Sequence, residues 1–448
     1  MRPGGMQHLS YVNLIKALLI SIFFSVLLFP GEKVMAKDHL TIVIDPGHGG
    51  DNPEGEADLG ASYNGVFEKE IDLITANALY DELSQYGNVT VYMTRTEDVH
   101  MELKDRADFA ASVGADMFIS VHYNASAHHR FYGTEIFTSA YGEEYAKAYS
   151  LAENIMRYWI EAGNDSKGIK VRLGEHGDYY GVIRMCRKQG IPAMILEHGY
   201  LDNDRDFDRL GSREFWEYIG RLDGAAIADY YGLVKGHEME SVREELSVSV
   251  PEDHISPDET PPEEVSVRVD AYDAERGILS YTVSAAEPDG FLMYYDLDTK
   301  ELAEDEELGF MHLKLWDRDE TSMKGEFEVP EGCRGPFVAR VYNNYEKYTD
   351  TDSFWIPEEM YPKEASENEA ESEGTSGLSD NSDIPEIGMG GGEPSKEDAA
   401  HGEGQEDPQS RAYRWILAVF ALLLSLLVLF LALNGVKRSR KRRKRTGG

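Results

Sequence analysis

The sequence predicts an α/β domain, in which helices cover a β-sheet, followed by a smaller all-β sandwich. Three observations lead to this expectation. Between residues 40 and 235, short apolar runs alternate with amphipathic segments at helical spacing. After residue 264 the pattern changes to short alternating strands separated by turn residues. A length of 448 residues suits two or three domains better than one.

The α/β domain begins with an apolar run that predicts a strand at 42–45, and this strand ends in the turn Asp45-Pro46-Gly47. A helix is expected at 68–85, where apolar residues such as Ile71 and Leu83 recur at helical spacing. The same alternation continues along the chain. Strands are expected at 89–94, 117–121, 133–138 and 193–196, and helices at 103–112, 143–162 and 213–231.

The second part of the chain is separated from the first by residues 236–263, which are polar, acidic and proline-bearing and therefore suit a linker. An immunoglobulin-like β-sandwich is expected over 264–357. Its predicted strands are 265–269, 278–283, 290–295, 312–316, 325–329 and 336–342. Histidine and cysteine do not cluster there, so we expect a spacer or a module that binds a protein partner.

Both ends of the chain carry targeting signals. Residues 1–36 suit a signal peptide, because basic residues precede a short apolar core and Val34-Met35-Ala36 offers a cleavage site. Residues 358–411 are rich in Glu, Ser and Gly and predict a disordered acidic linker. Residues 415–434 contain an apolar run of about 19 residues, long enough for a transmembrane helix. The basic tail, 435–448, marks the cytoplasmic side. The sequence thus predicts a single-pass membrane protein with its folded domains on the extracellular face.

Composition narrows the chemistry. The formal net charge of −38 argues against a nucleic-acid partner, because binding phosphates requires Lys and Arg. The only cysteines, Cys186 and Cys333, fall in different predicted domains, which argues against a disulfide and excludes a zinc–thiolate cluster. Any metal site must therefore use histidine and carboxylate ligands.

Four side chains in the α/β domain have the chemistry of such a site. His48 follows the first strand, Glu68 begins the next helix, and His122 and Glu197 each end a buried strand. Two histidines and one carboxylate form a common catalytic zinc set, with a fourth position left to water. A second carboxylate can then transfer a proton.

Each of these residues also has an ordinary structural interpretation. His48 fits a turn residue, His122 fits a buried core histidine, and Glu68 fits a helix N-terminus, where Glu70 is a rival ligand. Glu197 is harder to explain without function, because burying a carboxylate without a partner is costly.

The region from Thr41 to about Leu210 resembles the zinc-dependent N-acetylmuramoyl-L-alanine amidases of bacterial cell walls (amidase type 3). Six blocks carry the resemblance in the same order, namely 42–50, 68–69, 94–95, Leu103 with Arg106, 115–125 and 196–203. The resemblance implies an amidase-type α/β fold with a mixed central sheet flanked by helices. The implied substrate is peptidoglycan, cut at the amide between N-acetylmuramic acid and L-alanine.

The resemblance also implies a role for each candidate residue. His48, Glu68 and His122 would bind Zn²⁺, and Glu197 would act as general base and acid. Two positions depart from the family pattern. His198 replaces a small or aliphatic residue and would add a ligand or an acid, and Tyr123 replaces a smaller residue and would narrow the cleft.

The leading hypothesis is a membrane-anchored zinc amidase that hydrolyses peptidoglycan outside a bacterial cell membrane, with its C-terminus in the cytoplasm. A second hypothesis is a catalytically silent protein that binds the cell wall or acts as a scaffold. A third is a different zinc hydrolase, such as a peptidase or a deacetylase.

Overall fold

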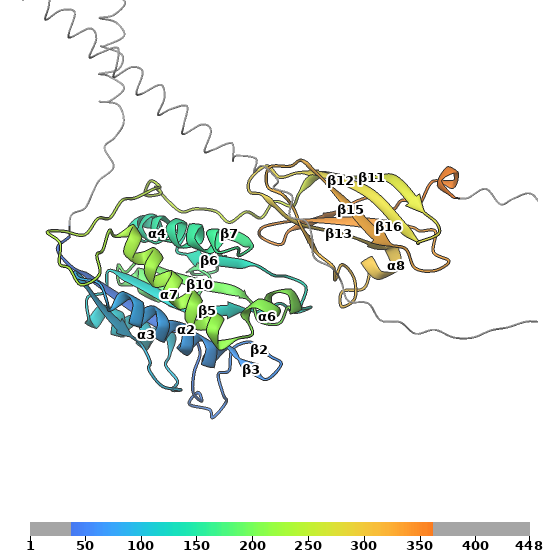
Figure 1. The fold of residues 1–448 in the computed structure, drawn as a ribbon. Coiled ribbons are helices and arrows are strands. Elements are labelled where there is room, and N and C mark those ends of the chain that lie inside the picture. Colours follow the sequence, from blue (N-terminus) through green and yellow to red (C-terminus); the bar gives the residue numbers. More distant parts are fainter. Residues whose placement is uncertain (1–36, 362–448) are drawn as a thin grey trace, which may run out of the picture. The chain divides into compact units, whose positions relative to one another are not determined.

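The structure is a computed structural model that describes residues 37–361, which belong to one compact unit of the chain (Figure 1). Within it an α/β domain precedes a β-domain, as the sequence predicts. The predicted signal peptide (1–36), spanning segment (415–434) and basic tail (435–448) lie outside the described residues, as does nearly all of the predicted acidic linker (358–411).

A six-stranded sheet forms the centre of the α/β domain. Its strand order is β4-β1-β5-β10-β6-β7. The strands are β1 (Leu40–Pro46), β4 (Val89–Met93), β5 (Met117–Asn124), β6 (Thr134–Thr138), β7 (Ser166–Val171) and β10 (Ala193–Tyr200). Strand β6 runs antiparallel to β10, whereas all other neighbouring strands pair in parallel, so the sheet is mixed, as the resemblance implied. Short two-residue pairs, β2 (Ser62–Tyr63) with β3 (Val66–Phe67) and β8 (Leu173–Gly174) with β9 (Gly177–Asp178), form outside it.

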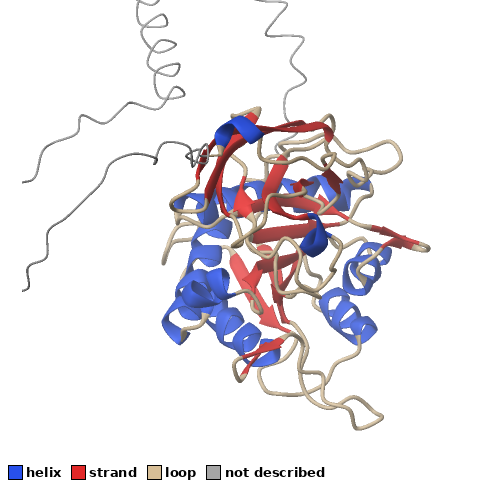
Figure 2. Cartoon of the chain, turned by 90° about the vertical axis from the view of Figure 1, so that its right-hand side faces the viewer, coloured by secondary structure: helices blue, strands red, loops and turns tan. Residues whose placement is uncertain are grey.

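Helices cover both faces of this sheet, as Figure 2 shows with red strands lying between blue helices. One face packs on α2 (Glu68–Leu83), α4 (Gly142–Glu161) and α7 (Arg213–Tyr230), and the other on α3 (Leu103–Ser112) and α5 (Gly181–Lys188). Helix α6 (Asp204–Leu210) follows β10. Successive residues of a strand point to opposite faces. Ile42 and Ile44 of β1 therefore join the first core, and Val43 joins the second.

The β-domain consists of two antiparallel sheets. One contains β11 (Glu263–Asp273), β12 (Ile278–Ala286) and β15 (Ser322–Glu328), and the other β14 (Lys314–Leu315), β13 (Leu292–Thr299), β16 (Phe337–Asn343) and β17 (Tyr348–Asp350). Two short helices, α8 (Lys300–Ala303) and η1 (Glu358–Met360), accompany them. Val283 of β12 and Val341 of β16 share one buried core, so the sheets pack face to face as the predicted sandwich.

The β-domain packs directly on the α/β domain. Tyr132 of the α/β domain lies in one buried cluster with Tyr294 and Tyr342 of the β-domain. The Tyr132 hydroxyl donates to the backbone oxygen of Leu313 at 3.0 Å. The predicted linker is also packed rather than free, because Val242 is buried in the core of the α/β domain. Aromatic burial therefore holds the two domains together.

The predicted membrane location is corrected by the structure. Among residues 37–361 no helix is long and apolar enough to cross a bilayer. Helix α4, the longest described, has 20 residues, but it carries Glu143 and Glu144 in its first turn and buries only one face. Charged groups inside a bilayer are costly. The prediction of a single-pass cell-membrane protein with an extracellular catalytic domain and a cytoplasmic C-terminus therefore does not stand.

A buried polar cluster yields a stability prediction. Asp223 of α7 accepts a hydrogen bond from the Trp159 indole at 2.7 Å and lies 2.8 Å from His198 Nε2. We expect Asp223→Ala to lower the free energy of unfolding by about 3 kcal/mol, because two buried polar groups lose their partner. The exposed Asp229 of the same helix provides the control, and Asp229→Ala should cost about 0.5 kcal/mol or less. Urea unfolding measures both values, and equal losses would contradict the prediction.

Candidate metal centre

The centre lies where the carboxyl ends of β1 and β5 meet the start of α2. His48 stands in the turn after β1 with φ 54°, and two glycines in the left-handed region follow it. Gly47 passes so close to β5 that a Cβ atom there would lie 2.2 Å from His122 Cε1. A glycine is therefore required at this position for the turn and the histidine to approach each other.

The three residues predicted as ligands converge. His48 Nε2 lies 3.2 Å from Glu68 Oε2, and His122 Nδ1 lies 3.0 Å from Glu68 Oε1. The two imidazole centroids are 5.1 Å apart. One ligand atom from each of these residues and from Asp72 lies within 4.8 Å of all the others. The rival residue Glu70 is exposed, so the structure favours Glu68.

Hydrogen bonds on the far side of each ring fix its orientation. His48 Nδ1 lies 2.7 Å from Asp58 Oδ1. Ser120 Oγ donates to Asp45 Oδ2 at 2.7 Å and lies 3.0 Å from His122 Nε2, so its oxygen is free to accept from that nitrogen. These contacts leave His48 Nε2 and His122 Nδ1 directed at the centre. Carboxylates and hydroxyls in this position commonly orient metal-binding histidines.

The ionisable groups at the centre shift each other's pKa values. Burial alone would raise the pKa of Glu68, but hydrogen bonds with His122 and His48 outweigh it and hold that pKa well below its usual range. Burial lowers the pKa of His48, but hydrogen bonds and charges from Glu68 and Asp58 outweigh this effect and raise it to about 9. The cluster therefore favours positive charge beside the Glu68 carboxylate.

Asp72 and Asp58 belong to the centre although the sequence interpretation did not include them. Asp72 lies one helical turn after Glu68 and is fully buried, and neither of its carboxylate oxygens has a hydrogen-bond partner among the described residues. Burial and the charge of Glu68 raise its pKa well above the usual range. Asp72 could have been found from the sequence, because it follows Glu68 by four residues on the same predicted helix and therefore shares its face. Asp58 lies in a loop, and no pattern in the sequence connects it to His48.

Glu197 lies beside the centre, at the end of β10. It pairs with His122 across the sheet on one side and with Glu135 on the other. The side chain is 8% exposed, and its Oε2 atom has no hydrogen-bond partner within the described chain. Burial, and then the charge of Glu68, raise its pKa well above the usual range. Glu197 is thus a buried carboxyl group with a free oxygen next to the histidine–carboxylate cluster.

Two sequence expectations about this site are wrong. His198 is fully buried and contacts Asp223 and the backbone oxygen of His122, so it is a core residue and neither a ligand nor an acid. Tyr123 is also buried, and its hydroxyl lies 2.8 Å from Thr75 Oγ1 on α2, so it does not narrow the cleft. Both follow residues that face the centre, and strand alternation turns them to the opposite side.

The donor set fits a divalent metal ion of the zinc type. Two imidazole nitrogens and one carboxylate face a common point, and this combination is typical of catalytic zinc sites. Gly60 also encloses the centre, because a Cβ atom there would lie 2.5 Å from Glu68 Oε2 and 2.6 Å from His48 Cδ2.

Comparison with known proteins finds relatives of the α/β domain. Residues 42–229 match the family model described as N-acetylmuramoyl-L-alanine amidase. The chain is 32% identical over 200 residues to the N-acetylmuramoyl-L-alanine amidase CwlM of Bacillus licheniformis, and the matched residues cover 43% of this chain and 70% of that protein. It is 29% identical over 195 residues to the sporulation-specific N-acetylmuramoyl-L-alanine amidase of Bacillus subtilis (strain 168), and this match covers 43% of this chain and 69% of that protein. The solved catalytic domain of CwlV, an N-acetylmuramoyl-L-alanine amidase from Bacillus (Paenibacillus) polymyxa var. colistinus, shares 30% identity, covers 43% of this chain and 97% of that chain, and has a TM-score of 0.35.

The raised pKa of His48 yields a prediction for the metal-free protein. Its pKa is about 9 in the folded state against 6.5 in the unfolded chain, so protonated His48 stabilises the folded state fully below pH 6.5. We expect this contribution to be lost as the pH rises through about 9. Urea unfolding in the presence of a chelator, for the wild type and His48→Gln, measures it. The stability difference should shrink between pH 6.5 and pH 9, and a constant difference would contradict the prediction.

Proposed function

The chain belongs to the N-acetylmuramoyl-L-alanine amidase family, and from this premise we propose that residues 40–235 form a zinc-dependent domain that hydrolyses peptidoglycan. The bond cut is the amide between N-acetylmuramic acid and the L-alanine of the peptide stem. The observation that supports this proposal most directly is the convergence of His48, Glu68 and His122 beside the buried carboxyl group of Glu197.

In this proposal His48, Glu68 and His122 hold the metal ion through Nε2, a carboxylate oxygen and Nδ1. A zinc ion bound by such a set polarises a carbonyl group and lowers the pKa of water toward neutrality. Asp58 and Ser120 keep the two imidazole rings in the required orientation through their contacts with the opposite ring nitrogens. Asp72 brings a further buried carboxyl group to the centre, and burial together with the charge of Glu68 favours its neutral form.

Glu197 moves the proton. Its unpartnered Oε2 takes a proton from the attacking water and then gives it to the leaving amide nitrogen, so that L-alanine departs with a free amino group. Burial favours the protonated form of Glu197, which allows the side chain to hold this proton between the two steps.

Digestion of purified peptidoglycan tests the proposal. The wild-type protein should release peptides with free N-terminal L-alanine, and a chelator should abolish this release. Glu197→Gln should lower the rate by about 10²- to 10⁴-fold, because the variant lacks the proton-transfer group. Glu214→Gln provides a matched control, since Glu214 is exposed on α7, and it should retain the wild-type rate.

Mass spectrometry of the products separates the alternatives. A peptidase or a deacetylase would leave the lactyl–alanine amide intact and release other products. Tight binding of cell wall without any cleavage, with or without zinc, would contradict the proposal and would indicate a catalytically silent protein.

A further inference from the structure

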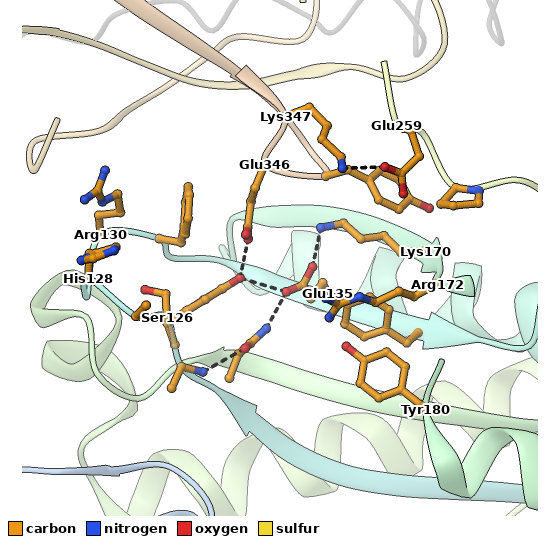
Figure 3. Close-up of a pocket in the computed structure, with 18 residues that line it drawn as sticks. Ser126, His128, Arg130, Glu135, Lys170, Arg172, Tyr180, Glu259, Glu346 and Lys347 are labelled. Atoms are coloured by element: carbon orange, nitrogen blue, oxygen red, sulfur yellow. Dashed lines mark hydrogen bonds and ion pairs between the residues drawn. The ribbon is translucent and has the colours of Figure 1, made fainter. Parts of the chain in front are cut away.

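A pocket of about 470 Å³ lies between the α/β domain and the β-domain (Figure 3). Asn124 and Glu135 of the α/β sheet line it, and Tyr345, Glu346 and Lys347, from the turn between β16 and β17, form its opposite wall. The matched family region ends at residue 229, so this wall comes from a part of the chain that the match does not include.

The pocket lies next to the candidate catalytic site in the sheet. Glu135 pairs with Glu197 across neighbouring strands, and Asn124 follows His122 by two residues on β5. Neighbouring strands lie about 4.8 Å apart. A substrate whose amide lies at Glu197 therefore needs to extend by only about the distance between two neighbouring strands to reach the pocket.

The carboxylates of the pocket are already paired with lysines. Lys170 pairs with Glu135, and the fully buried Lys167 pairs with Glu346. The Tyr200 hydroxyl lies 3.0 Å from Glu135 and 2.8 Å from Glu346, which joins the two pairs. At the rim, Lys347 pairs with Glu259 at 2.6 Å. Figure 3 shows the Lys170–Glu135 and Lys347–Glu259 pairs as dashed lines.

Two arginines in the pocket have no carboxylate partner within the described chain. Arg172 is exposed and stacks on the Tyr179 ring at 4.1 Å, and in Figure 3 it lies beside Tyr180. Arg130 is 7% exposed, and its Nε atom has no acceptor among the described residues. The pocket thus carries uncompensated positive charge in a protein with a net charge of −38.

We propose that this pocket binds a carboxylate-bearing part of the peptide stem and that Arg172 receives the carboxylate. The inference rests on the proposed function, because it takes the peptide stem as the segment that leaves the catalytic site on this side. A guanidinium beside a tyrosine offers a forked donor for a carboxylate and an aromatic surface for the peptide. The β-domain supplies one wall, which makes it part of the substrate-binding site.

Steady-state kinetics of the full chain test the assignment. The substrates are a muramoyl-peptide with free carboxylates and the same compound with its peptide carboxylates amidated. Arg172→Ala should raise KM for the free acid about tenfold and leave kcat within twofold, because a charge-assisted hydrogen bond is lost. The amidated substrate should not distinguish the variant from the wild type. Arg221→Ala, an exposed arginine on α7, is the matched control and should change neither constant.

A second variant reverses the sign of the effect. Glu346→Gln removes a negative charge from the wall of the pocket, and the positive charge of Lys167 then loses the carboxylate that pairs with it. Both changes make the pocket more positive, so KM for the free acid should fall below the wild-type value. The melting temperature of each variant verifies that it is folded. A rise of KM in both variants would show that packing rather than charge controls binding and would overturn the proposal.

Failure of this inference differs from failure of the proposed function. Equal cleavage of free and amidated substrates by wild type and Arg172→Ala overturns the pocket assignment and leaves the amidase proposal intact. If no substrate is cleaved, a binding measurement still tests the pocket assignment. The muramoyl-peptide with free carboxylates is titrated calorimetrically into the Glu197→Gln variant and into the double variant that also carries Arg172→Ala. Binding that weakens about tenfold without Arg172 supports the pocket, and binding that does not change overturns it.

Discussion

The carboxylate of Glu68 is the group on which the geometry of the site depends. It is buried, it lies between the two imidazoles, and it accepts backbone hydrogen bonds from Ala61 at 2.6 Å and from Tyr123 at 3.1 Å. These contacts tie the loop before α2, the helix itself and strand β5 to one side chain. A buried carboxylate is costly unless it is paired and hydrogen-bonded, so the surrounding structure has to hold all of these partners in place.

The sequence predicted the fold well where burial is periodic. The apolar runs of β1, β5 and β10 and the amphipathic faces of α2, α4 and α7 are visible because each element buries its own apolar residues. Strand β7 was not predicted, since Lys167 and Lys170 interrupt its pattern. They are buried only because Glu135 and Glu346, one of them about 180 residues away, neutralise them. Such pairing over long sequence distances leaves no local signal.

The same distinction applies to the candidate site. His48, His122 and Glu197 could be grouped because the ends of parallel strands meet at one edge of a sheet. The errors at Tyr123 and His198 arose because a side chain next to a functional residue on a strand faces the other way. Asp58 could not be found, because its place beside His48 depends on the path of a loop.

The position of Lys167 argues that the two domains act as one unit. Its ammonium group is fully buried, and Glu346 of the β-domain is its nearest carboxylate, while Glu135 lies at 3.7 Å. Removal of the β-domain would therefore leave a buried cation with a distant partner, and it would expose Tyr132 to solvent. The matched region, residues 42–229, contains the residues of the candidate site. The charge balance and the shape of the pocket beside that site are completed more than 100 residues later in the chain, by the turn that carries Glu346.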